Sequence, residues 1–337
     1  MAFLLTKPLG RVILAVAVVV IVVVGWFLLQ ADPIFAGKGK EVIVTVDQGD
    51  SLSSIAGKLH AKGVIASTFA FRIDTFFGAP VVQPGTYELR QGSTFAQVKS
   101  ILGNQPNVAA VEVSPGLTLK EVAFLVDGVK GVKYADSFAR DATADMTPSP
   151  YSHGSSLEGL IGATTYIITP TMTASELARD MVKNFNKEAA SVGLTPTTTV
   201  NGLNAYQLVT AASIVQKEGY IETRYMGKIA RVIYNRLARG GPLQMDSTVL
   251  YYLGQDGGTV TPAMLKINTP YNTYLYSGLT PTPICTVSTS ALKAVLRAPQ
   301  GTWLYFDTVN QQGKTLFATT FAQQLKNEDI AKKNGMP

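Results

Sequence analysis

The stretch NAYQLVTAASIVQKEGY, Asn204 to Tyr220, predicts an amphipathic helix that ends in an unexpected acidic residue. Asn204 is a favourable N-cap, and Gln207 three residues later occupies the reciprocal position of a capping box. Apolar or small side chains then recur at the spacing of one buried helix face, at Leu208, Ala211, Ala212 and Val215. We therefore expect a helix that packs one stripe against a core and that Gly219 ends in the usual C′ position.

Glu218, directly before that glycine, is unusual at a helix C-terminus, because the negative carbonyl end normally attracts Lys, Arg or His. It follows Val215 by three residues and Ile214 by four, so its side chain should emerge at the edge of the buried face. Partial desolvation and the helix end both penalise the carboxylate, which predicts a raised pKa. Such a carboxyl could act as a general acid near neutral pH. The alternative interpretation is a surface glutamate at a frayed helix end.

Composition narrows the class of chemistry. The 337 residues suffice for two or three domains. The net charge of +6, which is not concentrated in a basic block, favours modest attraction to anionic phospholipid or acidic polymer rather than to nucleic acid. The single Cys285 cannot form an internal disulfide and is expected to be a small buried residue. The two histidines, His60 and His153, lie far apart, which argues against a zinc site or a Ser-His-Asp triad. We expect acid–base chemistry without a metal or cofactor.

The N-terminal segment is a candidate membrane anchor. From Val12 to Leu29 about eighteen consecutive residues are apolar or small, enough for a helix that crosses a bilayer. Lys7 and Arg11 precede this run and no acidic residue does, so the positive-inside rule places the N-terminus in the cytoplasm. A signal peptide cleaved near Ile34-Phe35-Ala36 is the alternative, but the apolar run exceeds a normal signal-peptide core.

A short pattern then occurs three times, as VDQGDSLSSI from Val46, LRQGSTFAQV from Leu89 and VSPGLTLKEV from Val113. Each copy has the pattern of a strand end, a glycine turn, a Ser or Thr helix cap and a short amphipathic helix. The expected caps are Ser51, Thr94 and Thr118, the last with Glu121 in a capping box. A strand pattern at Glu41–Val46 precedes the first copy, and another from Gly85 precedes the second, so we expect small β-α modules. The alternative is that a strand, turn and helix recur three times by coincidence.

Four further segments are informative. Residues 131–156 are polar with few apolar anchors, which predicts long loops or a cover over a cleft. A second helix is expected from Glu222 to Arg239, stopped by the glycine pair that follows. In PLQMDSTVLYYLG, Asp246 could be a second catalytic carboxylate, but we favour an N-cap role. The stretch TPYNTYLYSGLTPTPI, Thr269 to Ile284, predicts a rigid aromatic loop that suits flat polar ligands such as sugars, or one that is packed for structural reasons only.

Together these motifs resemble the membrane-anchored endolytic murein transglycosylases, the YceG-like or MltG family. ASIVQKE resembles the family's ASIVEKE, NRL and PLQMDSTVLY resemble its NRL and LQTDPTVIY, and PYNTYLYSGLTPTPI resembles its YNTY-x-x-x-GLPPGPI. The resemblance covers nearly the whole chain and implies an α+β fold with a single N-terminal transmembrane helix, a small LysM-like β-α module and a mixed α/β catalytic domain. The implied divisions are a cytoplasmic segment, the transmembrane helix, a linker, a LysM-like glycan-binding subdomain and the catalytic domain, over residues 1–11, 12–30, 31–40, 41–107 and 108–337.

The resemblance also implies a reaction. The family's catalytic glutamate, the second acid of its E-K-E run, falls on Glu218, whereas the first acid is Gln216 here. Protonated Glu218 would donate to the glycosidic oxygen between N-acetylmuramic acid and N-acetylglucosamine. It would then take the proton of the muramic acid's own C6 hydroxyl, which closes onto C1 and leaves a 1,6-anhydro end. Because no water is activated, no second carboxylate is needed to hold one.

The implied activity is an endolytic lyase that terminates nascent glycan strands, without metal or cofactor, on the outer face of the cytoplasmic membrane. Its implied partners are peptidoglycan strands, the membrane and membrane-bound peptidoglycan synthases. The residues expected to hold sugar hydroxyl and acetamido groups are Gln244, Asp246, Asn272 and Tyr274. Lys217 should point away from Glu218 on the helix, so we assign it no chemistry.

The chain departs from the family pattern at three places. The family's LEGYLFPDTY is LEGLIGATTY here, with the changes at Gly162–Thr164; GLPPGPI has become GLTPTPI at Thr280–Thr282; and Thr315 stands for a histidine. These departures support a second hypothesis, a non-catalytic peptidoglycan-binding scaffold of the cell-wall synthesis machinery. A third, a pyridoxal-phosphate lyase related to aminodeoxychorismate lyase, would need a Schiff-base lysine in the cytoplasm, whereas the anchor exports the domain.

Overall fold

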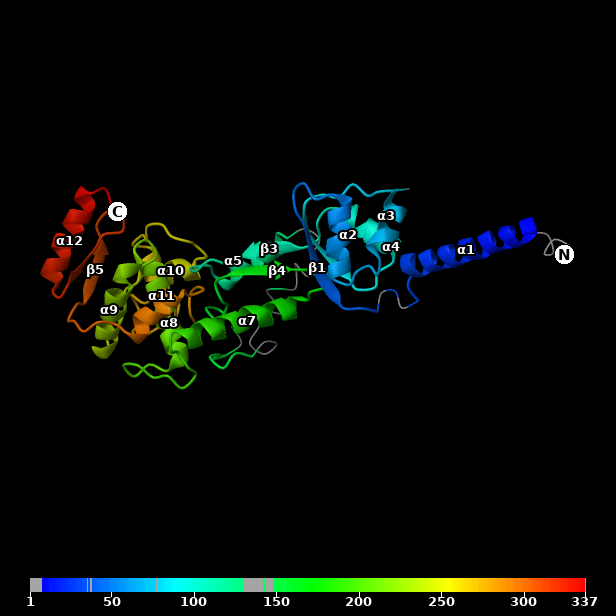
Figure 1. The fold of residues 1–337 in the computed structure, drawn as a ribbon. Coiled ribbons are helices and arrows are strands. Elements are labelled where there is room, and N and C mark those ends of the chain that lie inside the picture. Colours follow the sequence, from blue (N-terminus) through cyan, green and yellow to red (C-terminus); the bar gives the residue numbers. More distant parts are fainter. Residues whose placement is uncertain are drawn as a thin grey trace. The chain divides into compact units, whose positions relative to one another are not determined.

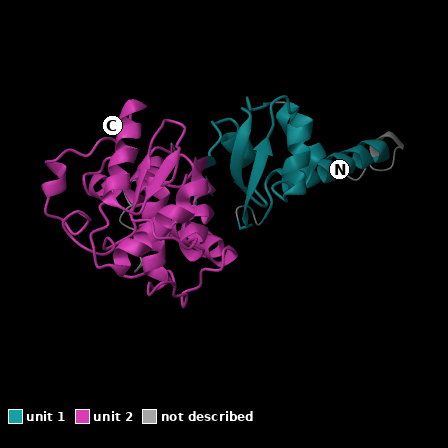
Figure 2. Cartoon of the chain, turned by 90° about the vertical axis from the view of Figure 1, so that its left-hand side faces the viewer, with its two compact units in different colours: residues 1–109, 167–171 teal, residues 110–166, 172–337 magenta. Residues whose placement is uncertain are grey.

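The computed structural model describes residues 8–34, 36, 38–76, 78–129, 138, 142, 148–154 and 156–336 (Figure 1). The chain forms two compact units, residues 1–109 with 167–171 and residues 110–166 with 172–337 (Figure 2). Both contain helices and short strands, which confirms the predicted mixed helix and strand content. Most of the loop region predicted at 131–156 lies outside the described residues.

Unit 1 joins a long apolar helix to a small antiparallel sheet with three helices. Its elements in chain order are α1 (Pro8–Ala31), β1 (Glu41–Val46), α2 (Leu52–Ala61), α3 (Thr68–Phe76), β2 (Gly85–Arg90) and α4 (Phe95–Leu102). β1 pairs antiparallel with β2, Glu41 opposite Arg90 and Val46 opposite Gly85. The core contains the fully buried rings of Phe71, Tyr87 and Phe95. Within α1, Arg11–Ala31 is long and apolar enough to cross a membrane, which fits the predicted single-pass anchor.

The three repeated turn-helix segments form, but not as separate modules. Ser51, Thr94 and Thr118 each accept a hydrogen bond from the backbone N–H three residues later, at the starts of α2, α4 and α5 (Leu119–Asp127). The strands that precede the first two copies pair with each other in one sheet. The third copy follows β3 (Ala109–Glu112), whose partner is β4 (Thr165–Ile168). A lone short strand would leave its backbone groups unpaired, so two copies share one sheet.

Unit 2 is mainly helical, and α8 (Ala205–Glu218) is buried along most of its length. α8 packs against α9 (Met226–Ala238), α10 (Asp246–Tyr252) and α11 (Thr289–Leu296). The other elements that follow α5 in unit 2 are α7 (Ala174–Ser191), the short 3₁₀ helices η3 (Thr223–Tyr225) and η4 (Met264–Lys266), β5 (Tyr305–Thr308), β6 (Thr315–Ala318) and α12 (Phe321–Lys333). The helix predicted from Glu222 to Arg239 is thus η3 followed by α9. β5 and β6 pair antiparallel, and α12 packs on both.

The predicted start of α8 is confirmed, and its end differs in one respect. The Gln207 N–H donates to Asn204 Oδ1 at 3.0 Å, and the Asn204 N–H donates to Gln207 Oε1 at 2.9 Å. Gly219 ends the helix, but its φ is −112°, not the left-handed value of a C′ glycine. A Cβ at Gly219 would lie 2.8 Å from Met226 Cγ and 3.1 Å from the Val215 carbonyl oxygen. Glycine is therefore needed for the close approach of α9 rather than for positive φ.

Candidate active site

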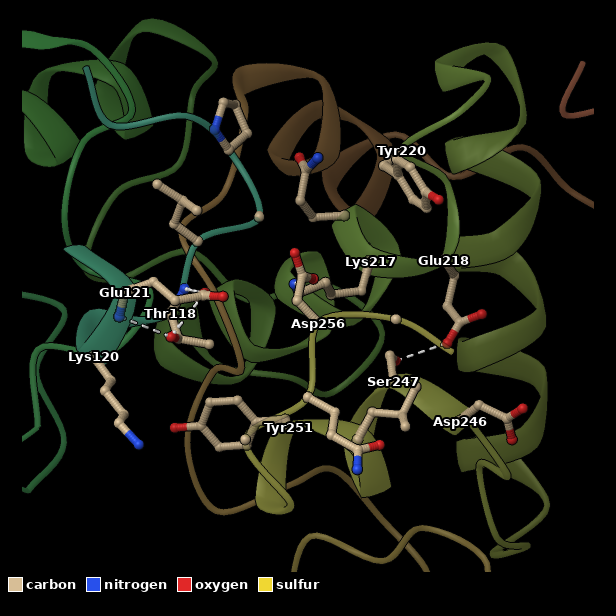
Figure 3. A pocket seen from close by; sticks show the side chains of 18 of the residues that line it. Thr118, Lys120, Glu121, Lys217, Glu218, Tyr220, Asp246, Ser247, Tyr251 and Asp256 are labelled. Carbon is tan, nitrogen blue, oxygen red and sulfur yellow. Dashed lines mark hydrogen bonds and ion pairs between the residues drawn. The ribbon is translucent and has the colours of Figure 1, made fainter. Parts of the chain in front are cut away.

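A cleft of about 530 Å³ opens at the C-terminal end of α8 (Figure 3). Its walls come from three segments: the turn before α5 with the first turns of α5, the end of α8, and α10 with the loop that follows it. Figure 3 shows Glu218, Ser247 and Asp246 on one side of this cleft, and Thr118 with Glu121 on the other. The residue singled out by its odd position at a helix end therefore lies in a cleft wall.

The carboxyl group of Glu218 is held by its neighbour on α10. Ser247 Oγ donates to Glu218 Oε1 at 2.7 Å, and the glutamate side chain is half-buried. Burial raises the pKa of Glu218, and the negative charge of Asp246 raises it further. The hydrogen bond from Ser247 and the positive charge of Arg236 act in the opposite direction on the same pKa. The net direction is upward, as the sequence predicted, so the neutral acid is favoured more than in water.

Asp246 is the first residue of α10, and the N-cap role predicted for it is wrong. The cap residue is Met245, which makes no side-chain cap hydrogen bond. The Gln244 N–H donates to the Thr273 carbonyl oxygen at 2.9 Å, and the Met245 N–H donates to Thr273 Oγ1 at 3.0 Å. This pairing holds the chain outside the helix as far as Met245 and shifts the helix start by one residue. Asp246 Oδ1 accepts a hydrogen bond from the Tyr274 hydroxyl at 2.5 Å instead of capping.

Asp246 and Tyr274 are thus brought together beside Glu218. Burial, together with the hydrogen bond to Asp246, raises the pKa of the Tyr274 hydroxyl. The phenol therefore keeps its proton and donates a hydrogen bond to the side chain of Asp246. Gln244 is exposed just before this pair and has φ of 52°, a left-handed conformation that is uncommon for a residue other than glycine. Neither Gln244 nor Tyr274 is among the residues that line the cleft itself.

Asn272 is placed differently from its predicted role. It is fully buried, and its Nδ2 donates to the carbonyl oxygens of Leu265 at 3.0 Å and Ile267 at 2.9 Å. Its Oδ1 accepts the Tyr274 N–H at 3.0 Å. The side-chain amide therefore holds the loop in shape and positions Tyr274 from behind.

The opposite wall is organised by Glu158, a residue that the sequence reasoning did not single out. Both carboxylate oxygens of the buried Glu158 accept the Leu119 N–H at the start of α5, at 3.0 and 3.1 Å, and Tyr251 donates its hydroxyl at 3.1 Å. Burial raises the pKa of Glu158 to about 7, although these hydrogen bonds oppose the shift. Gly159, with φ of +72°, makes the turn after it, and a Cβ there would lie 2.3 Å from Pro283 Cβ. The LEG sequence is the local signal that could have indicated this buried turn.

Several other cleft residues were not predicted. Tyr220 and Phe124 expose large aromatic rings, with exposed fractions of 67% and 77%. Lys217 does turn away from Glu218, but it lines the cleft and forms an ion pair of 2.6 Å with Asp256 in the loop after α10. Gln216 accepts the N–H of Ser288 at 3.1 Å and so ties α8 to the start of α11. The signals for these contacts are weak, because each partner lies far away in the sequence.

Among the residues that the structure describes, no group of three His, Cys, Asp or Glu side chains lies close enough to hold a metal ion. Cys285 is free and fully buried, as predicted for a small apolar residue.

These features define a class of protein: an apolar N-terminal helix, a small unit of helices and strands, and a larger unit whose aromatic-walled cleft holds Glu218, a carboxyl group of raised pKa. The chain belongs to the YceG-like family, whose model matches residues 44–330. The predicted family is confirmed.

Named relatives and a solved structure agree with this membership. The endolytic murein transglycosylase of Bacillus subtilis (strain 168) is 29% identical over 326 residues, which cover 90% of this chain and 89% of that protein. The endolytic murein transglycosylase of Streptococcus pneumoniae serotype 2 is 27% identical over 319 residues, 85% of this chain and 57% of the longer relative. A crystal structure described as a yceG-like protein from Listeria monocytogenes aligns with a TM-score of 0.57 and 27% identity, over 86% of this chain and 99% of that one.

Proposed function

We propose that the chain is an endolytic lytic transglycosylase of peptidoglycan in which Glu218 is both the acid and the base. The observation that carries this proposal is the half-buried carboxyl group of Glu218 in a cleft wall, hydrogen-bonded by Ser247 at 2.7 Å and with a raised pKa. A general acid needs a proton and access to the leaving oxygen; the raised pKa favours the first, and the position in the cleft wall supports the second. Relatives named endolytic murein transglycosylase support the substrate class.

In the proposed reaction, protonated Glu218 donates to the oxygen that links N-acetylmuramic acid to N-acetylglucosamine, and the C1–O bond breaks. Positive charge develops at C1 and on the ring oxygen. The new carboxylate then takes the proton of the C6 hydroxyl of the same muramic acid, whose oxygen bonds to C1. The products are a 1,6-anhydro end and a new N-acetylglucosamine end, and Glu218 is protonated again, so atoms and protons balance without water.

Neighbouring groups have distinct proposed roles. Ser247 occupies Oε1 of Glu218, which leaves Oε2 to carry the transferred proton. The carboxylate of Asp246, held by Tyr274, raises the pKa of Glu218 and stabilises positive charge at C1. Gln244 is proposed to contact the substrate, because backbone strain at a non-glycine residue often accompanies a functional site. Asn272 would act through Tyr274 and not by touching sugar.

The aromatic walls suit a glycan. Tyr220 and Phe124 present exposed ring faces in the cleft, and such faces pack well against the apolar faces of sugar rings. Polar groups beside them, including Lys217, Asp256 and Gln255, would bind hydroxyl, acetamido and lactyl oxygens. The mixture of flat apolar surface and hydrogen-bonding groups is what a polar polymer with flat rings requires.

The family departures favour the enzyme over a non-catalytic scaffold. Within the described part of the chain, none of Gly162–Thr164, Thr280–Thr282 and Thr315 lines the cleft around Glu218. Gly162 packs on α7, where a Cβ would lie 2.8 Å from Asn184 Cβ. Thr282 Oγ1 bonds within its own loop, 2.9 Å from the Tyr271 hydroxyl. Gly162 and Thr282 therefore have local structural roles, and the departures lie outside the cleft that holds the acid.

The N-terminal part gives the proposal its location. We propose that α1 is a single-pass anchor with its N-terminus inside, so that both units face the outer side of the cytoplasmic membrane. There the enzyme would meet nascent strands and the membrane-bound synthases that make them, and its cuts would terminate elongation. Residues 41–107, with the strand-helix-helix-strand order of β1, α2, α3 and β2, are proposed to be a LysM-like glycan-binding subdomain.

The test is product analysis with purified full-length chain and uncrosslinked glycan strands. Internal cuts with anhydro ends are expected from the wild type, and Glu218→Gln should abolish them while it keeps glycan binding. Glu328→Gln, the same chemical change on α12, is the matched control and should leave the products unchanged. Binding without cleavage by the wild type would favour the scaffold. Unchanged cleavage by Glu218→Gln would refute the assignment of the acid.

A further inference from the structure

Helix α3 buries one side in unit 1 and exposes large apolar side chains on the other. Ala70, Phe71 and Thr75 are buried. On the opposite side Phe69, Ile73 and Phe76 are exposed, with fractions of 63%, 36% and 85%. These three lie at i, i+4 and i+7, so they share one face of the helix. Single exposed apolar residues are common, whereas a continuous row that includes two phenylalanines marks an interaction surface.

Helix α3, which carries this face, neighbours the apolar helix α1. The two helices pack against each other, and Phe27 of α1 meets the ring of Phe95 edge-on, with ring centroids 6.4 Å apart. Phe27 and Ala31 both pack against the buried core of unit 1. The end of α1 therefore packs against the folded core of unit 1.

The length of α1 then fixes where a bilayer surface must lie. The apolar span Arg11–Ala31 has 21 residues. At about 1.5 Å per residue it covers roughly 30 Å, which is the thickness of a hydrocarbon core. A crossing that begins near Arg11 and covers this thickness includes Phe27. A membrane that holds α1 must consequently reach the part of unit 1 that contacts Phe27 and α3.

We propose that the exposed face of α3, formed by Phe69, Ile73 and Phe76, inserts into the headgroup region of the leaflet on the side of unit 1. An amphipathic helix that lies in the interface buries its apolar face to about this depth. Arg72 is exposed beside the face, so its guanidinium can reach lipid phosphates while its stem stays near the apolar row. Lipid is the favoured occupant because α3 packs directly on α1, the helix that is long and apolar enough to cross a membrane. The second contact would fix the tilt and rotation of unit 1, which a single helix leaves free.

The inference rests on the proposed anchor, so the experiment reports on α1 and α3 separately. Full-length chain is placed in nanodiscs of phosphatidylcholine and phosphatidylglycerol, with one nitroxide label per chain on an introduced cysteine. Cys285 is fully buried, and chain without an added cysteine gives the labelling background. Labels replace Val20 in α1, Phe69 or Phe76 in α3, and the exposed Ser53 in α2 as control. The measurement compares collision with dissolved oxygen, which concentrates in lipid, and with a water-soluble nickel chelate.

The ratio of collision with oxygen to collision with the nickel chelate should be several-fold higher for labels at Val20, Phe69 and Phe76 than for the label at Ser53. If the Val20 label favours oxygen but both α3 labels behave like Ser53, the inference is wrong and the anchor stands. A Val20 label that behaves like Ser53 overturns both. Spin–spin broadening at Phe76 only in discs that hold two chains would assign the face to a second copy instead.

A second variant separates insertion from mere proximity to α1. Phe69→Ser with Phe76→Ser should expose a label at Ile73 to the nickel chelate, whereas Ser53→Ala should leave the Ile73 label in lipid. Equal oxygen preference in both variants would mean that the α3 face does not insert by its own apolar side chains, and would contradict the proposal.

Discussion

Removal of the Ser247 hydroxyl should move the pH profile of the reaction in a direction that only a catalytic Glu218 explains. Ser247 Oγ donates to Glu218 Oε1 at 2.7 Å. A hydrogen bond to a charged group contributes about 1.5–3 kcal/mol and one to a neutral group about 0.5–1.5 kcal/mol, so loss of the donor costs the carboxylate roughly 1–1.5 kcal/mol more than the acid. At about 1.36 kcal/mol per pH unit, Ser247→Ala should raise the pKa of Glu218 by about one unit.

The sign of the effect on rate follows from the required protonation state. Activity needs the neutral acid and falls as pH rises through the pKa of Glu218, so the alkaline limb of kcat/KM should move about one unit higher in Ser247→Ala. The assay is release of anhydro-ended fragments from soluble glycan strands at a series of pH values. Ser247→Thr keeps a hydroxyl and should keep the wild-type limb. An alkaline limb in Ser247→Ala that stays in place or moves to lower pH would refute the reasoning, whatever the absolute rate.

Three other perturbations test neighbouring parts of the account. Asp246→Asn removes a negative charge that raises the pKa of Glu218, so the alkaline limb should move to lower pH, opposite to Ser247→Ala; a shift to higher pH would contradict the electrostatics. For Glu158 the folded pKa of about 7 exceeds the ordinary 4.5, so its stabilising contribution is complete below pH 4.5 and is lost as pH rises through 7. Relative to Glu158→Gln, the wild type should lose about 3 kcal/mol of unfolding free energy between pH 4.5 and pH 7. The measurement is urea titration followed by Trp303 fluorescence. A difference between the two proteins that does not change with pH would count against the buried carboxyl. Gly159→Ala should destabilise unit 2 by about 2–4 kcal/mol, because the new side chain would combine a positive φ with a contact to Pro283. Gly193→Ala, at a positive φ in open space, should cost about 1 kcal/mol. Equal losses of unfolding free energy in urea would show that the contact to Pro283 does not matter.

Local signals in the sequence predicted the elements well. The cap at Asn204 and those of the three repeats depend on residues three positions apart, and each forms as predicted. The position of Glu218 at the edge of a buried face also follows from helix periodicity alone. The reasons are physical, since hydrogen bonds within one turn need no distant partner.

Predictions failed where a distant segment changes a local choice. Asp246 has the local pattern of an N-cap, but pairing of Gln244 and Met245 with Thr273 moves the helix start. Gly219 has the pattern of a left-handed terminus, but close packing of Met226 explains it instead. The donor Ser247 lies 29 residues from Glu218, and Glu158 lies 39 residues from Leu119. No periodicity encodes these contacts, which depend on how helices pack.

The central claim is that Glu218 protonates the glycosidic oxygen and then directs the sugar's own hydroxyl, not water, to C1. The most direct measurement is digestion of glycan strands in water enriched in ¹⁸O, followed by mass spectrometry of the muramic acid ends. The account predicts anhydro ends that contain no heavy oxygen in the wild type, and no new ends in Glu218→Gln. Reducing ends that carry one ¹⁸O atom would mean that water is the nucleophile, with Asp246 as a candidate base, and would contradict the account.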